Sequence, residues 1–137
     1  MLSVAPDATR RIYHPPVVSC EQAAAARGIA LSAELKTLLL QSSRMRIAVH
    51  LRGDTRLRLR DLQFVEPAIL ARGGLQAGAI NPWNVSFCRY HVLCLRVLAN
   101  REMATNAGVL DVGQFFPTAA LLNLPNLIVG FLGEFSD

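Results

Sequence analysis

A long uncharged stretch near the C-terminal end places the strongest constraint on the fold of this chain. Residues 112 to 133 carry no charged side chain, and about 20 apolar residues are enough to cross a bilayer. However, Pro117, Pro125 and several amide side chains interrupt the stretch, and such residues break a membrane helix or leave polar groups in lipid. The stretch therefore predicts a buried strand, a short helix and a second strand, which require a substantial folded core.

The composition is that of one globular domain. The chain has 137 residues, of which 52% are hydrophobic and 18% charged, and this excludes a disordered chain. A net charge of +4 gives a mild attraction to phosphate, which fits a transient RNA substrate. The three cysteines have no framework spacing, and the N-terminus lacks an apolar secretory segment. We therefore expect a reduced, cytoplasmic protein with no membrane or DNA partner.

The local patterns predict a single α+β domain in residues 13 to 137, preceded by a loosely held arm in residues 1 to 12. Strands outnumber the short helices, which favours a mixed, mostly antiparallel or barrel-like sheet flanked by helices. Residues 56 to 62 alternate like a strand, but we interpret them as a turn that enters a short helix. The other expected elements are helices at about Cys20–Arg27, Pro67–Arg72 and Pro117–Leu122, and strands at Leu35–Leu40, Arg44–Leu51, Val85–Leu98, Val109–Phe115 and Leu127–Phe131.

The second strand of the predicted hairpin should have two different faces. Alternate side chains point to opposite sides of a strand, so Met45, Ile47, Val49 and Leu51 should face the core. The opposite face is basic and is either solvated or in contact with a nucleic-acid backbone. It consists of Arg44, Arg46, Ala48, His50 and Arg52.

Lys36 is the only lysine of the chain, and it stands directly before the apolar end of the first hairpin strand. A compact ammonium placed where a strand enters a core is costly unless a polar partner or a ligand meets it. Lys36 is therefore the first candidate for a functional residue. The alternative is that its apolar stem reaches solvent from the end of the strand.

A loop in residues 76 to 84 is the second candidate. Gly78 allows the backbone to approach a ligand closely, and Pro82 fixes the direction in which the chain leaves. An ordinary structural turn has the same composition. The sequence leaves both interpretations open.

Cys88, His91 and Cys94 form the one cluster that suggests a metal. On a continuous strand the two cysteines would point to one side and the histidine to the other, and no fourth ligand stands nearby. We therefore expect neither a metal nor another cofactor.

Several stretches of the sequence carry a resemblance to a known family. In order they are HPPVVSCEQAAAARGI, ELKTLLL, RLRLRDL, GAINPW, and TNAG followed by FPTAALL. They resemble the YbaK and prolyl-tRNA synthetase-associated domain family of aminoacyl-tRNA editing deacylases, and Gly78-x-x-x-Pro82 is similar to the glycine-to-proline loop of that family. The resemblance implies a metal-independent ester hydrolase that clears mischarged tRNA, alone or beside a synthetase. It also implies that Lys36 and the backbone of Gly78 form the catalytic site.

Hydrolysis of an activated ester needs a positioned water and a stabilised oxyanion more than a protein nucleophile. The family is thought to recruit the terminal ribose hydroxyl of the tRNA, and this chain accordingly shows no serine, histidine and aspartate constellation. The residues that we expect around the substrate are Thr37, His50, Asn81, Pro82 and Asn106.

Three features depart from the pattern of the family. The segment between Leu62 and Pro67 is shortened, Glu102 and Met103 replace a histidine and a proline, and Thr37 replaces an asparagine of some relatives. The amino-acid preference of those relatives is therefore not transferred to this chain. The main alternative function is a catalytically inactive relative that binds tRNA or a synthetase, and a small metal-binding protein ranks third.

Overall fold

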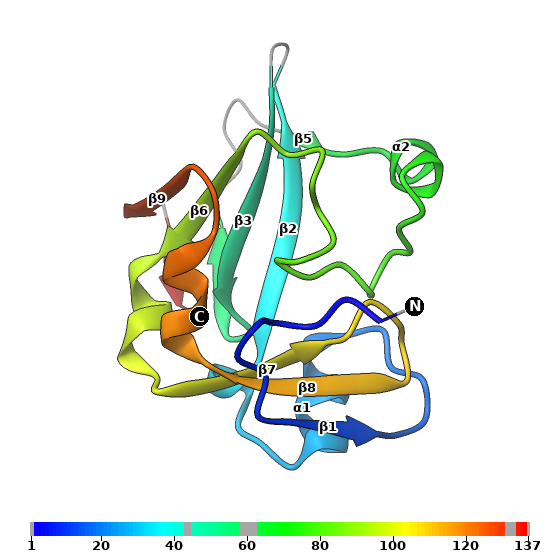
Figure 1. Cartoon of the computed structure of the whole chain (residues 1–137), viewed down its shortest axis with the longest axis vertical. Coiled ribbons are helices and arrows are strands. Elements are labelled where there is room, and N and C mark those ends of the chain that lie inside the picture. Colours follow the sequence, from blue (N-terminus) through cyan, green and yellow to red (C-terminus); the bar gives the residue numbers. More distant parts are fainter. Residues whose placement is uncertain (1, 43–44, 58–62, 131–133, 137) are drawn as a thin grey trace.

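The predicted hairpin around Lys36 forms the centre of the larger sheet (Figure 1). The computed structural model describes residues 2–42, 45–57, 63–130 and 134–136. In it, β2 (Leu35–Gln41) and β3 (Arg46–Arg52) pair antiparallel, with Leu35 opposite Arg52 and Gln41 opposite Arg46. The short β5 (Gln63–Phe64) pairs antiparallel with β2.

Two parallel strands extend the sheet beyond β3. These are β6 (Tyr90–Cys94) and β9 (Leu127–Gly130), and the strand order is β5-β2-β3-β6-β9. The sheet therefore mixes antiparallel and parallel pairs. Together with the short helices, this confirms the predicted α+β class with a mixed sheet.

A second sheet lies across one end of the β2–β3 hairpin (Figure 1). It has the order β1-β8-β7, with antiparallel pairs throughout. A backbone bridge from Glu34 to Ala104 connects the two sheets at the start of β2. A separate antiparallel pair joins β4 to β10. The bounds are β1 (Arg10–Tyr13), β7 (Glu102–Asn106), β8 (Val112–Pro117), β4 (Thr55–Leu57) and β10 (Glu134–Ser136).

Two of the three predicted helices are confirmed as α1 (Cys20–Arg27) and α2 (Pro67–Arg72). Ser19 caps the start of α1, because Gln22 N donates to Ser19 Oγ at 3.1 Å, and Gln22 Oε1 accepts from Val18 N at 3.0 Å, one residue before the cap. Gly28 ends α1 in the left-handed conformation, with φ of 69°. Three 3₁₀ segments complete the fold, namely η1 (Leu31–Ala33), η2 (Leu95–Ala99) and η3 (Thr118–Asn123).

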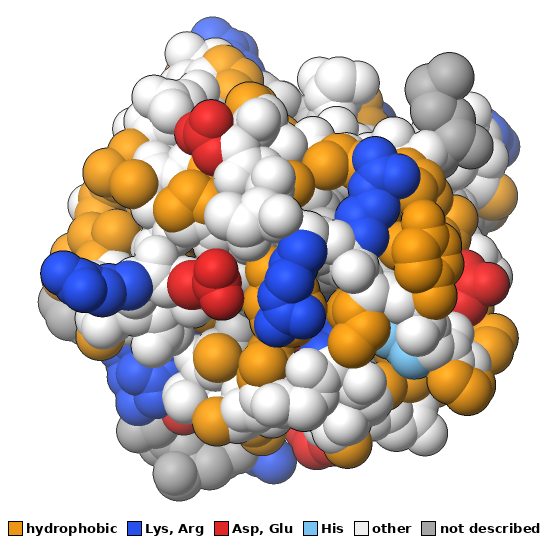
Figure 2. All heavy atoms as spheres, turned by 60° about the horizontal axis from the view of Figure 1, so that its bottom comes forward, with side chains coloured by type: hydrophobic (Ala, Val, Ile, Leu, Met, Phe, Trp, Pro, Cys, Tyr) orange, Lys and Arg blue, Asp and Glu red, His pale blue; other side chains and the backbone are white. Residues whose placement is uncertain are grey.

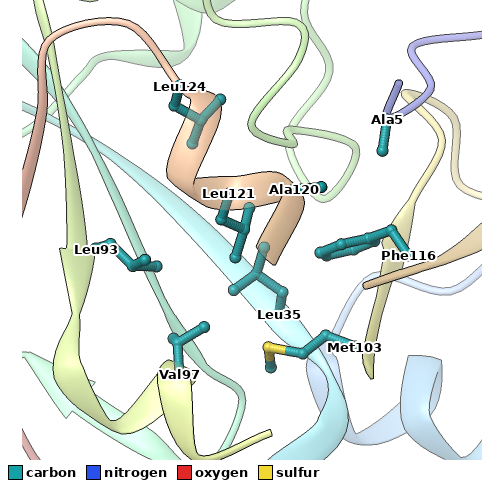
Figure 3. Packing of buried hydrophobic residues seen from close by; sticks show 9 residues of the cluster. All are labelled: Ala5, Leu35, Leu93, Val97, Met103, Phe116, Ala120, Leu121 and Leu124. Atoms are coloured by element: carbon teal, nitrogen blue, oxygen red, sulfur yellow. The ribbon is translucent and has the colours of Figure 1, made fainter. Parts of the chain in front are cut away.

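The largest apolar cluster packs the two sheets against each other (Figure 3). Each fully buried large side chain of this kind contributes about 1.5–3 kcal/mol relative to an exposed one. Burial of these residues therefore holds the start of β2 against the second sheet. The cluster consists of Ala5, Leu35, Leu93, Val97, Met103, Phe116, Ala120, Leu121 and Leu124.

The long strand predicted for Val85–Leu98 is wrong. The strand is limited to β6, and η2 follows it directly. Cys88 lies before the strand, in a turn where its N–H donates to Val85 O at 3.0 Å. A parallel strand that is buried on both faces shows no alternation, so the apolar pattern could not separate the strand from the buried turns beside it.

The basic face predicted for the second hairpin strand is also corrected. Ala48 and His50 are fully buried, because β3 is central in its sheet and is covered on both faces. Met45, which we expected in the core, is 41% exposed. Arg44 lies outside the described residues, as do residues 58–62 of the predicted turn and Phe131 of the predicted last strand.

The N-terminal residues are held more firmly than the loose arm that we expected. Ser3 N donates to Ala107 O at 2.8 Å, and Ala5 N donates to Gln114 Oε1 at 2.8 Å. Local sequence patterns could not reveal this, because the partners lie about a hundred residues away. The helix predicted for Pro117–Leu122 is the 3₁₀ segment η3. In the described part of the chain, no helix is both long and apolar enough to cross a membrane.

Candidate active site

A pocket of about 120 Å³ opens between α1, the start of β2 and the loop that contains Gly78. The turn between β7 and β8 closes another side through Leu110. On the face of the molecule toward α1 and the second sheet, Lys and Arg side chains stand among hydrophobic ones (Figure 2). The pocket lining includes Cys20, Glu34, Lys36, Thr37, Gly78 and Asn106.

The structure brings four of the seven predicted site residues to this pocket, namely Lys36, Thr37, Gly78 and Asn106. The other three do not line it. His50 is fully buried behind Thr37, Asn81 is fully buried beside Asn106, and Pro82 lies further along the loop.

Lys36 is half-buried on β2, and its neighbour Leu35 belongs to the main apolar cluster. Among the residues that the structure describes, the Lys36 ammonium has no hydrogen-bond or ion-pair partner. A cation at the wall of a pocket with no partner is available to a ligand that carries negative charge or develops it.

The loop presents the backbone of Gly78 to the pocket. Gly78 has φ of +86°, and a Cβ added there would lie 3.2 Å from Leu110 Cδ2. A side chain at this position would therefore strain the backbone and crowd the pocket wall. The Gly78 N–H donates to no residue of the described ranges, so it is free to donate to a ligand.

Asn81 and Asn106 brace this loop. Asn81 Nδ2 donates to Ser3 O at 2.9 Å and to Asn106 O at 3.0 Å, while its Oδ1 accepts from Trp83 N at 2.8 Å. Asn106 Nδ2 in turn donates to Ile80 O at 2.8 Å. Both side-chain amides are thus engaged with the backbone, and they position Gly78.

A buried ion pair lies beside Lys36, and the sequence analysis missed it. Arg27 Nη1 donates to Glu34 Oε1, and the two side chains are only 1% and 4% exposed. Arg27 Nε also donates to His14 Nε2 at 3.3 Å. Gly113 makes room for the guanidinium, because an added Cβ would lie 2.3 Å from Arg27 Nε.

The second carboxylate oxygen of Glu34 has no partner. Oε2 is buried and lies within hydrogen-bonding distance of no donor in the described part of the chain. Burial raises the pKa of Glu34 to about 7, although the Arg27 guanidinium opposes this shift. A charged residue two positions before the single lysine was the one sequence signal that could have pointed to it.

A chain of three side chains runs from the pocket into the core. Thr37 Oγ1 and His50 Nδ1 are 2.9 Å apart, and His50 Nε2 and His91 Nδ1 are 2.8 Å apart. Burial, and then the neighbouring His91, lowers the pKa of His50 to about 3, and burial also lowers the pKa of His91. Both rings are therefore neutral. Each ring carries one N–H, so the two hydrogen bonds that link Thr37, His50 and His91 must run in the same direction. They fix the position of the Thr37 hydroxyl.

The three cysteines lie apart from one another in the described structure. Cys88 and Cys94 belong to separate apolar clusters, and His91 is occupied by His50. Across residues 2–42, 45–57, 63–130 and 134–136, no three His, Cys, Asp or Glu side chains are placed to hold a metal. Cys20 does line the pocket, but burial, followed by the nearby Glu34 charge, raises its pKa to about 11. Its thiol therefore stays protonated near neutral pH.

Comparison with known proteins shows that solved structures share this fold. No protein-family model matches the chain, and no curated protein matches it in sequence. The chain is similar to the crystal structure of a protein proposed to be a trans-editing enzyme for prolyl tRNA synthetase. The identity is 18% over 88% of this chain and 83% of that one, with a TM-score of 0.75.

Two further structures share the fold. The hypothetical protein APE2540 is 19% identical over 88% of both chains, with a TM-score of 0.75. A scaffold protein for the computational grafting of linear epitopes is 22% identical over 88% of this chain and 83% of that one, with a TM-score of 0.76. At these identities the similarity establishes a shared α+β fold.

Proposed function

We propose that this protein is an aminoacyl-tRNA deacylase that hydrolyses the ester of mischarged tRNA in trans. One observation carries the proposal: Lys36 and Gly78 line one pocket, and neither the Lys36 ammonium nor the Gly78 N–H has a partner among the described residues. The fold shared with a proposed trans-editing enzyme supports the same conclusion.

The chemistry of an aminoacyl ester fits these two donors. As water adds to the ester carbonyl, negative charge develops on the carbonyl oxygen, and a cation and a free N–H in a pocket stabilise it. The fixed Thr37 hydroxyl supplies a hydrogen bond that orients the substrate at the pocket wall. The Asn81 and Asn106 braces keep the Gly78 N–H in place before the substrate arrives.

Substitution of Lys36 tests the proposal. Lys36→Ala should lower the rate of deacylation on the order of a hundredfold or more, because a transition-state contact is lost. Stability should change little, because a half-buried lysine without a partner gains little from its position. The assay follows loss of the ester from a panel of mischarged tRNAs under single-turnover conditions.

Two variants serve as controls. Arg72→Ala removes one exposed cation at the end of α2, outside the pocket, and should leave the rate unchanged. Lys36→Arg should remain folded but slow, since a planar guanidinium cannot place a single point charge at the same position. If Lys36→Ala stays as fast as the parent, the catalytic role is wrong. A parent protein that binds tRNA but cleaves no ester would support the inactive binding module instead.

A further inference from the structure

The Glu34 carboxylate lines the pocket together with Lys36, and the proposed function does not yet use it. Only 3% of the surface of Glu34 is exposed. Arg27 holds Oε1, and Oε2 is left with no donor in the residues that the structure describes. A buried carboxylate oxygen without a donor is costly, so its position indicates a donor that enters with the reaction.

The groups that face Glu34 come from several elements. Arg27 and Cys20 lie on α1, Lys36 lies on β2, and His14, before α1, contacts Arg27. The Cys20 thiol donates no hydrogen bond to Oε2, and Arg27 is already engaged by Glu34 Oε1. An incoming water is a donor that can satisfy Oε2, and the water consumed by hydrolysis must enter this pocket.

We propose that Glu34 is the general base that activates the hydrolytic water, an inference that rests on the deacylase function proposed above. Arg27 acts as a positioning residue, because it fixes Oε1 and leaves Oε2 for the water. The carboxylate is suited to the task near neutral pH, where its pKa of about 7 gives a large ionised fraction together with useful basicity.

The step balances without a cofactor. The water oxygen bonds to the ester carbonyl carbon as one of its protons passes to Glu34 Oε2, and the carbonyl oxygen becomes an oxyanion beside Lys36 and Gly78. The oxyanion then reforms the carbonyl, the bond to the ribose oxygen breaks, and the proton on Glu34 passes to that oxygen. The products are the free amino acid and a tRNA with a free terminal hydroxyl, and the carboxylate is regenerated.

The test is the pH dependence of single-turnover deacylation, with spontaneous ester hydrolysis subtracted. The parent rate should rise about tenfold per pH unit at acidic pH and level off near pH 7, where Glu34 becomes ionised. Glu34→Gln should lose a factor of about a hundred or more and should lose the bend in the profile. A purely structural role would not remove the bend.

Folding of the variants is checked by thermal unfolding. Should Glu34→Gln fail to fold, because it leaves Arg27 without a counter-charge, Glu34→Asp keeps the charge but shortens the reach by one methylene. It should fold, keep a bend and react at least about tenfold more slowly, because the base no longer reaches the water. A folded Glu34→Gln or Glu34→Asp variant with the rate and profile of the parent overturns the assignment.

A substrate ending in 2′-deoxyadenosine lacks the neighbouring ribose hydroxyl, so it tests whether Glu34 or that hydroxyl is the base. The parent should still cleave it with a bend near pH 7, whereas a fall to the level of Glu34→Gln would overturn the role of Glu34. The experiment distinguishes failure of the deacylase function from failure of the Glu34 assignment. A parent that cleaves no aminoacyl ester overturns the function and this assignment together, but an active parent with an equally active Glu34→Gln overturns only the assignment.

Discussion

Gly113→Ala should break the Arg27–Glu34 pair without altering either charged residue. Gly113 lies on β8, and an added Cβ would meet Arg27 at 2.3 Å from Nε, 2.9 Å from Cδ and 3.0 Å from Cζ. Ordinary contacts begin near 3.4 Å, so the guanidinium must move by about 1 Å. The Arg27 side chain is 1% exposed and has little space in which to move, so the hydrogen bond to Glu34 should be lost.

Gly113→Ala should lower the free energy of unfolding by about 3 kcal/mol, which is the lower end of the range for breaking a buried ion pair. The lower end applies because Glu34, with a pKa of about 7, can be neutralised by taking up a proton once Arg27 moves away. Urea unfolding at pH 8 measures the loss. At pH 5 the loss should be smaller, since the carboxyl is already largely protonated there.

Gly130→Ala is the matched control. Gly130 is also a strand glycine, on β9, and an added Cβ there meets no atom of the described residues within 4 Å. This substitution should change stability by less than about 1 kcal/mol. A Gly113→Ala protein as stable as Gly130→Ala would refute the reasoning. So would full additivity of Gly113→Ala and Glu34→Gln, because two changes to one ion pair should be coupled.

Two further outcomes follow from the charges. The pKa of His50 is about 3 in the folded protein but about 6.5 in the unfolded chain. The contribution of neutral His50 to the free energy of unfolding is therefore fully present above pH 6.5 and is lost as the pH falls toward 3. Urea unfolding of the parent should show this loss, and His50→Phe should flatten it; an unchanged slope between pH 6 and 4 would contradict the burial argument. Affinity for tRNA, measured by filter binding, should fall only shallowly with salt, because Arg52 is already bound to Asp54, with Nε and Oδ1 2.9 Å apart. A steep slope would instead indicate a broad phosphate-binding surface.

Local patterns were sufficient for the elements whose signals lie within a few residues. Two neighbouring apolar segments predicted the hairpin of β2 and β3, and the helix expected at Cys20–Arg27 has the bounds of α1. The cluster of Lys36 and Gly78 was predicted only through the family resemblance. Nothing in the local sequence relates positions that are 42 residues apart.

Pairings over long distances could not be predicted. The parallel register of β3 and β6 places His50 beside His91, but the sequence pattern suggested His91 only as a metal ligand. The Arg27–Glu34 pair was missed for a similar reason. A basic residue at the end of a helix and an acidic residue before a strand are expected to be exposed, and only tertiary packing buries them.

The pairing of β1 with β8 affects the order in which the protein can be assembled during translation. Arg10 lies opposite Phe115, so the first strand of the chain waits for a partner that is synthesised roughly a hundred residues later. At about 5–20 residues per second, the ribosome needs at least about 5 s to make that partner. The β2–β3 hairpin can form early, since its strands are close in sequence. Leu110 closes one side of the pocket and lies just before β8, so a nascent chain would have Lys36 in place well before it had a closed site.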